Sequence, residues 1–182
     1  MLGHTPGPAN PFIGFGRNEA RFRADSPRKM ESLQDRYSPN AVCFGCGPSN
    51  PRGLQIKSRP EGDYVVADWT PEPHHTAFSG FTNGGIMSVL LDCNGNITAA
   101  YALMKARGLD APPGTVTAEL TVRFLKPTPL GPTLHLKARA SKIEGDKVTV
   151  EGSIEADGVQ TAAMRGVYAA VRKGHPAFDK WT

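Results

Sequence analysis

The strongest constraint on the fold is a long apolar stretch, GGIMSVLLDCNGNITAAYALM, which runs from Gly84 to Met104 and contains one charged residue, Asp92. Its apolar residues recur at the spacing of a helix with one buried face. They are Ile86, Val89, Leu90, Cys93, Ile97, Ala100, Tyr101 and Met104. Glycines, asparagines and an acid within the stretch argue against a membrane span. Gly108 is a suitable helix terminator, and the Pro112-Pro113-Gly114 segment forbids continuation.

Asp92 has two interpretations. A lone acid in an apolar helix is costly to ionise unless it is paired, so it is a candidate for an activated carboxylate. Ser88, Asp92 and Asn96 are also four residues apart, and together they form a narrow polar stripe that is equally suited to solvent.

The segments around this helix have the period of strands. Two short strands are predicted near Gln55–Arg59 and Tyr64–Thr70. After the helix, apolar and polar residues alternate in four further segments, near 116–124, 134–141, 148–154 and 159–172. This order predicts an α+β domain in which one curved antiparallel sheet wraps around the helix. In the 116–124 segment, the alternation places Thr117 on the face away from the helix.

Composition divides the 182 residues into a leader, one domain and a tail. Residues 1–40 are rich in Gly, Pro and mixed charge, with a short helix predicted near Pro27–Tyr37. This leader has two possible sites of packing, its own domain or a partner subunit. The predicted domain covers 41–174, and 175–182 form a tail.

The charge pattern, the N-terminal sequence and the cysteine count limit the binding partners and the cellular compartment that we expect. The net charge is +4, but the basic residues are dispersed and form no run of the nucleic-acid-binding type. No secretory signal is recognisable, and three cysteines, an odd number, do not indicate a disulfide framework. We therefore expect a cytoplasmic protein that binds neither nucleic acid nor membrane.

The loop CFGCGPSNPRGL contains the pair Cys43-x-x-Cys46. A single such pair is weak evidence for a metal site without further ligands at suitable spacing. His74, His75 and Cys93 are the further candidates, but nothing in the sequence places them near the loop. We therefore predict no metal, with the cysteines as packing residues.

The segments His74–Leu103 and Pro113–Gly131, with the strands that follow, resemble the hotdog-fold acyl-CoA thioesterases of the 4-hydroxybenzoyl-CoA thioesterase and PaaI-like type. The family motif is a glycine-containing loop, then His-Gly-Gly opening a helix, then an acid about two turns later. Gly80, Gly84, Gly85 and Asp92 match these positions. The CFGCGPSNPRGL loop is similar to a segment in a subgroup of the family.

The resemblance implies a homodimer or dimer of dimers that hydrolyses an acyl-CoA thioester at its subunit interface. Asp92 would be the general base or nucleophile, and amides near Gly84 and Gly85 would polarise the carbonyl, as expected for unpaired donors at a helix N-terminus. Thr117 matches a hydroxyl that places water or substrate in relatives, although a simple strand residue is an equal alternative. No cofactor is expected beyond the coenzyme A of the substrate.

The resemblance also implies substrate contacts, and the chain departs from the family motif at two positions. His75, Gly80 and Phe81 are expected beside the substrate, and Arg123 near the coenzyme A phosphates. Asn83 stands where the family usually has His, and there it would orient the loop or cap the helix. Ala77 stands where some members carry an amide. These departures keep a non-catalytic acyl-CoA-binding protein as an alternative. A hotdog enoyl-CoA hydratase or dehydratase is a second alternative.

Overall fold

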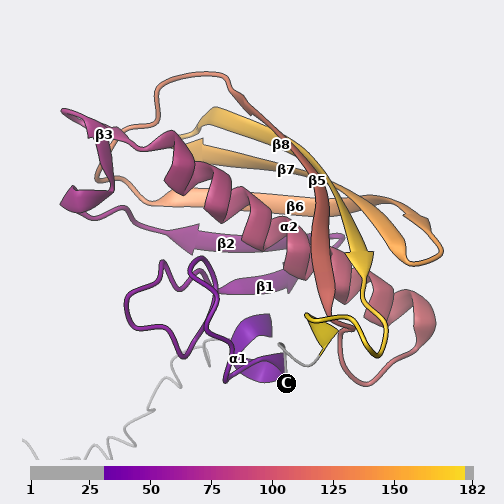
Figure 1. Cartoon of the computed structure of the whole chain (residues 1–182). Coiled ribbons are helices and arrows are strands. Elements are labelled where there is room, and N and C mark those ends of the chain that lie inside the picture. Colours follow the sequence, from indigo (N-terminus) through magenta and orange to yellow (C-terminus); the bar gives the residue numbers. More distant parts are fainter. Residues whose placement is uncertain (1–30, 179–182) are drawn as a thin grey trace, which may run out of the picture.

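The computed structural model describes residues 31–178 and has a six-stranded antiparallel sheet curved around one long helix (Figure 1). The sheet order is β1-β2-β6-β7-β8-β5. Its strands are β1 (Ser58–Glu61), β2 (Tyr64–Trp69), β5 (Thr115–Phe124), β6 (Leu134–Glu144), β7 (Lys147–Ala156) and β8 (Val159–Ala170). Helix α2 (Gly84–Arg107) lies across the concave face of this sheet. The predicted α+β hotdog architecture is confirmed.

Three smaller elements accompany this framework. Helix α1 (Leu33–Tyr37) lies near β1, and a 3-10 turn, η1 (Pro73–His75), precedes a short hairpin of β3 (Thr76–Phe78) and β4 (Phe81–Thr82). Helix α1 falls within the predicted Pro27–Tyr37 helix; residues 1–30 of the leader and 179–182 of the tail lie outside the described residues. The predicted first strand begins later, at Ser58, because the Ile56 N–H donates to the loop carbonyl of Gly45.

Helix α2 is buried on more than one side, so the expectation of a single buried face is wrong. One side packs on the sheet through residues such as Leu90, Leu91 and Leu103, all at most 1% exposed. Another side is covered by α1, where Leu33 packs in a cluster with Ile97. The chain between α1 and β1 adds further cover, so both faces of the helix contribute to the core.

The polar residues inside α2 are satisfied within the protein. Asn94 accepts a hydrogen bond from the Ser58 hydroxyl (2.9 Å) and donates to the Val65 carbonyl. Asn96 is 9% exposed and accepts from the Thr115 hydroxyl (2.8 Å). Asn96 therefore does not belong to a solvent-facing stripe. Because an unpaired buried amide is costly, these bonds fix the helix in one position against β1, β2 and β5.

A β-bulge in β5 corrects the predicted alternation of this strand. Thr117 pairs with Tyr168 and Glu119 with Val167, so Ala118 is an extra residue in the ladder. An extra residue reverses which side chains face the core. Thr115 and Thr117 therefore face α2, and from Leu120 onward the even-numbered residues do so. The predicted position of Thr117 on the outer face is wrong for this reason.

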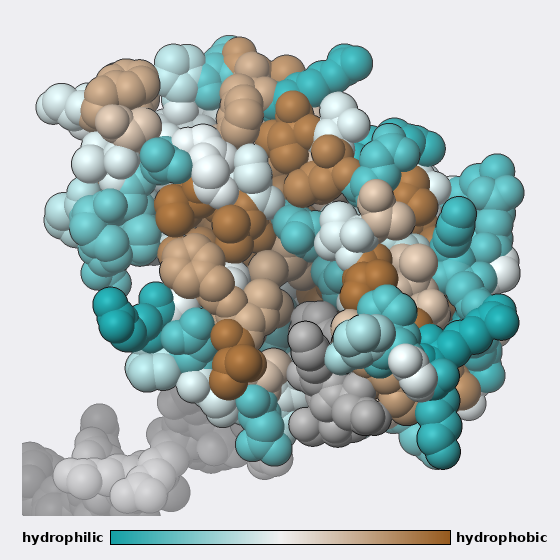
Figure 2. Space-filling model, in the orientation of Figure 1, coloured by the Kyte–Doolittle hydropathy of each residue, from teal (hydrophilic) through white to brown (hydrophobic). Residues whose placement is uncertain are grey.

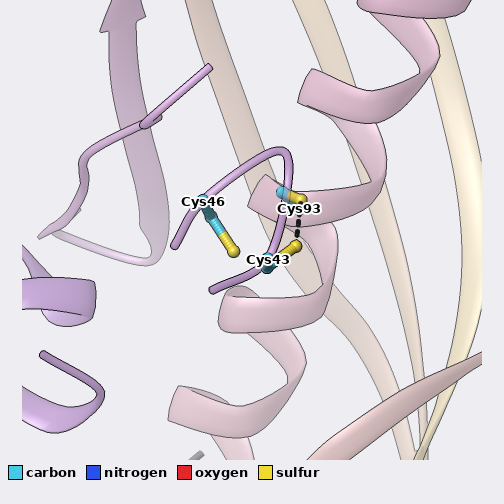
Figure 3. Close-up of side chains that lie close together, drawn as sticks. All are labelled: Cys43, Cys46 and Cys93. Atoms are coloured by element: carbon cyan, nitrogen blue, oxygen red, sulfur yellow. Dashed lines mark hydrogen bonds between the residues drawn. The ribbon is translucent and has the colours of Figure 1, made fainter. Parts of the chain in front are cut away.

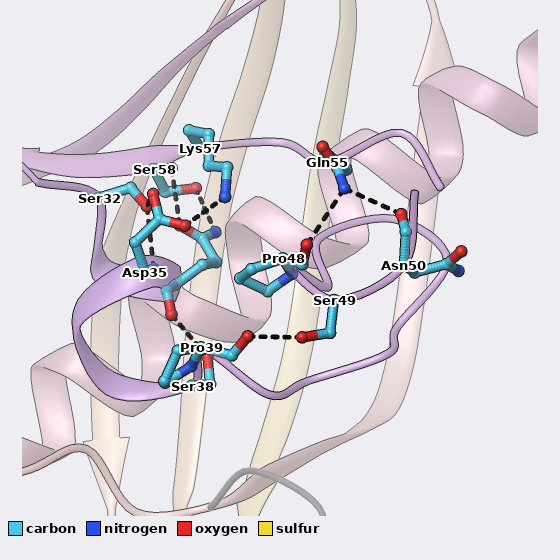
Figure 4. Close-up of polar contacts among 11 residues, drawn as sticks. Ser32, Asp35, Ser38, Pro39, Pro48, Ser49, Asn50, Gln55, Lys57 and Ser58 are labelled. Atoms are coloured by element: carbon cyan, nitrogen blue, oxygen red, sulfur yellow. Dashed lines mark hydrogen bonds and ion pairs between the residues drawn. The ribbon is translucent and has the colours of Figure 1, made fainter. Parts of the chain in front are cut away.

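Polar contacts hold the chain between α1 and β1 (Figure 4). The Gln34 side chain is fully buried, accepts from the Ser58 N–H (2.8 Å) and donates to the Ser58 hydroxyl. Asp35 accepts from the Ser32 hydroxyl and forms an ion pair with Lys57. This part of the leader thus packs on its own domain. Among residues 31–178, no helix combines the length and apolarity needed to cross a bilayer.

A substitution at Gly95 tests how closely α2 packs on the sheet. A Cβ at this position would lie 2.3 Å from the Tyr168 hydroxyl and 2.6 Å from Cε of Met164. We expect Gly95→Ala to lower the free energy of unfolding by about 1–3 kcal/mol through overpacking, measured by urea denaturation. As a control, Ala106→Gly on the exposed last turn measures helix propensity alone. It should lower the free energy of unfolding by about 1 kcal/mol. An unchanged or raised stability of Gly95→Ala would contradict the close approach.

Candidate active site

Asp92 is held against the edge of the sheet by a hydrogen bond from Thr117. Helix α2 directs the Asp92 carboxylate toward β5, and the Thr117 hydroxyl donates to its Oδ1 atom over 2.8 Å. Burial raises the pKa of Asp92, and the Thr117 hydrogen bond opposes part of this shift. A partly desolvated carboxylate is a better base than a solvated one. Asp92 is therefore partly desolvated and hydrogen-bonded, and it does not lie on a solvent-facing stripe.

Tyr168, to which no sequence motif pointed, positions the same turn of α2. Its side chain is fully buried, and its hydroxyl donates to the backbone carbonyl of Asp92 over 3.4 Å. Gly95 leaves the space that the ring needs. A tyrosine among the small residues of a core strand was the available signal, because a buried hydroxyl requires a partner.

The N-terminus of α2 is capped by Asn83. The Asn83 side-chain oxygen accepts from the N–H of Gly85 (2.8 Å) and from that of Ile86 (3.3 Å), as at many helix N-termini. No acceptor for the Gly84 N–H lies among residues 31–178. Gly84 therefore carries the available donor, whereas the Gly85 amide, predicted to share its role, is engaged by the cap.

An apolar hollow of about 340 Å³ lies beside Gly84. Its lining includes Phe78, Phe81 and Phe124, with Met87 at its base. Phe78 and Phe124 are more than half exposed, which is unusual for large apolar side chains. Figure 2 shows hydrophobic residues gathered over β5 and the neighbouring part of α2. The hollow has the chemistry of a pocket for an acyl group.

The other predicted substrate residues are dispersed. Phe81 lines the apolar hollow, and Gly80 forms the exposed turn before it with φ of 82°. Arg123 is exposed on β5. His75 lies in a separate hollow of about 540 Å³, where its ring contacts that of Trp69 in a tilted arrangement and its Nδ1 accepts from the Glu72 N–H. Burial lowers the pKa of His75, consistent with this acceptor role.

Gly84 and Asp92 cannot act on one carbonyl within one chain. They are eight residues apart on α2, which corresponds to about 12 Å along the helix axis. A reacting carbonyl must lie about 3 Å from both its oxyanion donor and its attacking group. Each chain therefore presents two separate groups of candidate residues: Asp92 with Thr117, and Gly84 with the apolar hollow.

All three cysteines of the chain lie close together (Figure 3). Cys43 and Cys46 come from the loop before β1 and Cys93 from α2; their sulfur atoms all lie within 4.8 Å of one another. Contact with the Cys46 thiol lowers the pKa of Cys43, and the same contact raises the pKa of Cys46 to about 12. Nothing in the sequence places Cys93 beside the loop, but the fold does so. His74 and His75 do not belong to this group.

Comparisons with known proteins agree with this architecture. The Thioesterase superfamily family model matches residues 79–163, which contain α2 and β5 to β7. The crystal structure of a Thioesterase superfamily protein from Shewanella loihica is 30% identical, with a TM-score of 0.57, covering 69% of this chain and 98% of that one. The chain belongs to the thioesterase superfamily.

More distant relatives of this thioesterase-superfamily chain share the fold. The PaaI protein of E. coli is 20% identical with a TM-score of 0.53, covering 65% of this chain and 81% of its own. A Streptococcus mutans protein solved with acetyl CoA is 16% identical with a TM-score of 0.54, covering 64% and 88%. The acyl-coenzyme A thioesterase THEM4 of Xenopus laevis is 32% identical over 84 residues, 46% of this chain. The match spans about a third (34%) of that curated relative's length.

Proposed function

We propose that the protein is an acyl-CoA thioesterase that hydrolyses its substrate to a free acid and coenzyme A. The observation that carries the proposal is the Asp92 carboxylate, half-buried and hydrogen-bonded to Thr117 at the edge of the sheet. Asp92 would act as general base toward a water molecule, or as nucleophile toward the thioester carbonyl. The family relationship and the name of the Xenopus laevis relative support this reaction class.

Thr117 would orient the carboxylate. Its hydroxyl donates to one oxygen of Asp92, which leaves the lone pairs of the other oxygen for water or substrate. The Gly84 N–H would bind the oxyanion that forms as the carbonyl is attacked, aided by the positive end of the α2 dipole. Asn83 would act through the helix as its cap, so a titratable side chain is not needed at that position.

The complete site would form between two copies of the chain. Strand β5 is at the edge of the sheet, with its outer backbone groups available for pairing. Thr117, which contacts Asp92, and Phe124, which lies beside Gly84, are near opposite ends of this strand. Antiparallel pairing of β5 with its symmetry copy would therefore bring Asp92 of one subunit close to the partner subunit's Gly84. A dimer, alone or paired again into a tetramer, follows from this arrangement.

The proposed substrate follows from the lining of this interface. The phenylalanines beside Gly84 would take the acyl group, and Arg123 on β5 would face the phosphates of coenzyme A. The acetyl CoA in the Streptococcus mutans relative supports this ligand class. No cofactor is needed for the reaction. The free thiols of the described chain suit a reducing compartment, so we place the enzyme in the cytoplasm.

A non-catalytic acyl-CoA-binding protein is the second candidate. Asn83 in place of the family histidine and the apolar Ala77 in the adjoining strand favour it, because the titratable ring and the polar amide that relatives carry are both missing. Thiol release from a panel of short, long and aromatic acyl-CoAs separates the two candidates. Saturable binding without release by the wild type would support the binding protein and contradict the thioesterase.

Replacing Asp92 tests the proposed base. We expect Asp92→Asn to lower kcat by about 10²-fold or more, because an amide takes no proton but still accepts from Thr117. Steady-state thiol release measures the effect, and circular dichroism checks the fold. Asp110→Asn, an exposed position beyond α2, is the matched control and should retain full activity. Turnover that survives in Asp92→Asn would remove Asp92 from the mechanism.

Replacing Gly84 by proline tests the oxyanion donor. Gly84 is the first residue of α2 and Asn83 has ψ of 132°, a position and a backbone that accept a following proline. Gly84→Pro deletes the N–H without breaking the helix, so we expect kcat to fall by about 10²–10³-fold. Gly84→Ala adds a Cβ but keeps the N–H, and is the control. Equal activity of the proline and alanine variants would exclude this donor.

Mixing the two inactive variants tests the composite site. If Asp92 and Gly84 act across the interface, a dimer of one Asp92→Asn chain and one Gly84→Pro chain contains one intact site. Random exchange of subunits should then restore about a quarter of wild-type activity. If the two residues act within one chain, every site is damaged and mixing restores nothing.

A further inference from the structure

The three-cysteine cluster has a feature that core packing does not require: the sulfur atoms converge. Cys93 is separated by 50 positions from Cys43 in sequence, yet their sulfur atoms are 3.8 Å apart. The Cys46 sulfur points toward the same space (Figure 3). Small apolar side chains would fill this volume equally well, whereas thiolates gathered in this way bind soft metal ions.

The geometry points to a zinc site formed by Cys43, Cys46 and Cys93. In tetrahedral coordination with the usual Zn–S distance of about 2.3 Å, two sulfur ligands lie about 3.8 Å apart. The Cys43–Cys93 separation matches this value, and all three sulfur atoms lie within 4.8 Å of one another. Side-chain adjustments of a few tenths of an ångström to about one ångström would bring the cluster around one ion.

The loop backbone is shaped to direct its two thiols to one side. The Gly47 N–H donates to the Cys43 carbonyl (2.9 Å), closing a tight turn around the C-x-x-C pair. A Cβ on Gly47 would lie 2.4 Å from the Cys43 nitrogen, so only glycine fits this turn. Phe44, between the two cysteines, is half exposed, so the intervening side chain points away from the cluster. Such turns are typical of paired zinc ligands.

A second close approach brings the loop to α2. A Cβ on Gly45 would lie 2.3 Å from the Cys93 sulfur and 2.7 Å from Cγ1 of Val89. The glycine thus allows the loop to rest directly on the helix at Cys93. The ion would join two segments that contact each other here mainly through small groups.

The three cysteines would supply three of the four zinc ligands, and they determine the charge of the site. No His, Asp or Glu among residues 31–178 joins the group, so water or another exogenous ligand would take the fourth position at the more open Cys43 side. Each thiol would lose its proton to solvent as its sulfur–zinc bond forms. Three thiolates and Zn²⁺ then carry a net charge of −1. The ion would be structural, tying the loop to α2 next to Asp92, and takes no part in the proposed hydrolysis.

The experiment measures metal directly and does not depend on thioesterase activity. The full chain is purified in reductant without metal-affinity resin, and zinc per chain is determined by elemental analysis. We expect one zinc ion per chain. After zinc is removed by a chelator, Co²⁺ should produce a thiolate-to-cobalt charge-transfer absorption that saturates at one equivalent and is lost when Zn²⁺ displaces the cobalt.

Variants from both segments make the test specific. Cys43→Ser in the loop and Cys93→Ala on α2 should each weaken Zn²⁺ affinity by more than about 10-fold in competition with a chromophoric chelator. Ser49→Ala, an exposed hydroxyl in the same loop, is the matched control and should bind as the wild type does. Circular dichroism confirms that each variant folds; Cys43 is the most exposed of the three, so its variant is the primary test.

Two results would overturn the zinc site. One is a wild-type affinity no higher than that of Cys43→Ser. The other is a chain purified in reductant that contains no zinc and, after chelator treatment, gives no thiolate-to-cobalt absorption with Co²⁺. Neither result affects the thioesterase proposal, because Asp92 is not one of the zinc ligands. For the same reason, Asp92→Asn should bind zinc as the wild type does.

Discussion

The contact between Gly95 of α2 and Tyr168 of β8 sets the distance between the helix and the sheet. Any side chain at position 95 would collide with the tyrosine hydroxyl. At this separation the Tyr168 hydroxyl reaches the Asp92 carbonyl, and the Asp92 carboxylate reaches Thr117 on the neighbouring strand. The buried amides of Asn94 and Asn96 fix the rotation of the same turn. The position of the acid therefore results from the packing of the core.

Much of the fold followed from local pattern. The period of the 84–104 stretch predicted α2, and the change to period two predicted β5 to β8 in the observed order. Asp92 was identifiable as the one charge in an apolar helix. These features depend on residues close together in the sequence, where propensity and periodicity act directly.

Most of the errors came from contacts between distant segments. The side of the sheet that Thr117 faces depends on the extra residue at Ala118, which pairing with β8 determines. The approach of Cys93 to the C-x-x-C loop depends on how that loop folds onto α2, and the second buried side of α2 has the same origin. The engagement of Gly85 by Asn83 required the geometry of the cap. None of these changes the hydrophobic pattern of the segment that it affects.

Because of the bulge at Ala118, the number of residues in β5 matters for the fold independently of which residues they are. If one residue were lost there, the core-facing half from Leu120 onward could keep its place only by turning Thr115 and Thr117 to the outer face. Asp92 and Asn96 would then both lose their hydrogen-bond partners, Thr117 and Thr115, although no catalytic residue had been replaced. A substitution at an outward-facing position of this strand leaves these contacts in place, whereas an insertion or deletion in it separates the acid from its hydroxyl. In β5, the spacing of the residues thus matters as much as their side chains for bringing Thr117 to Asp92.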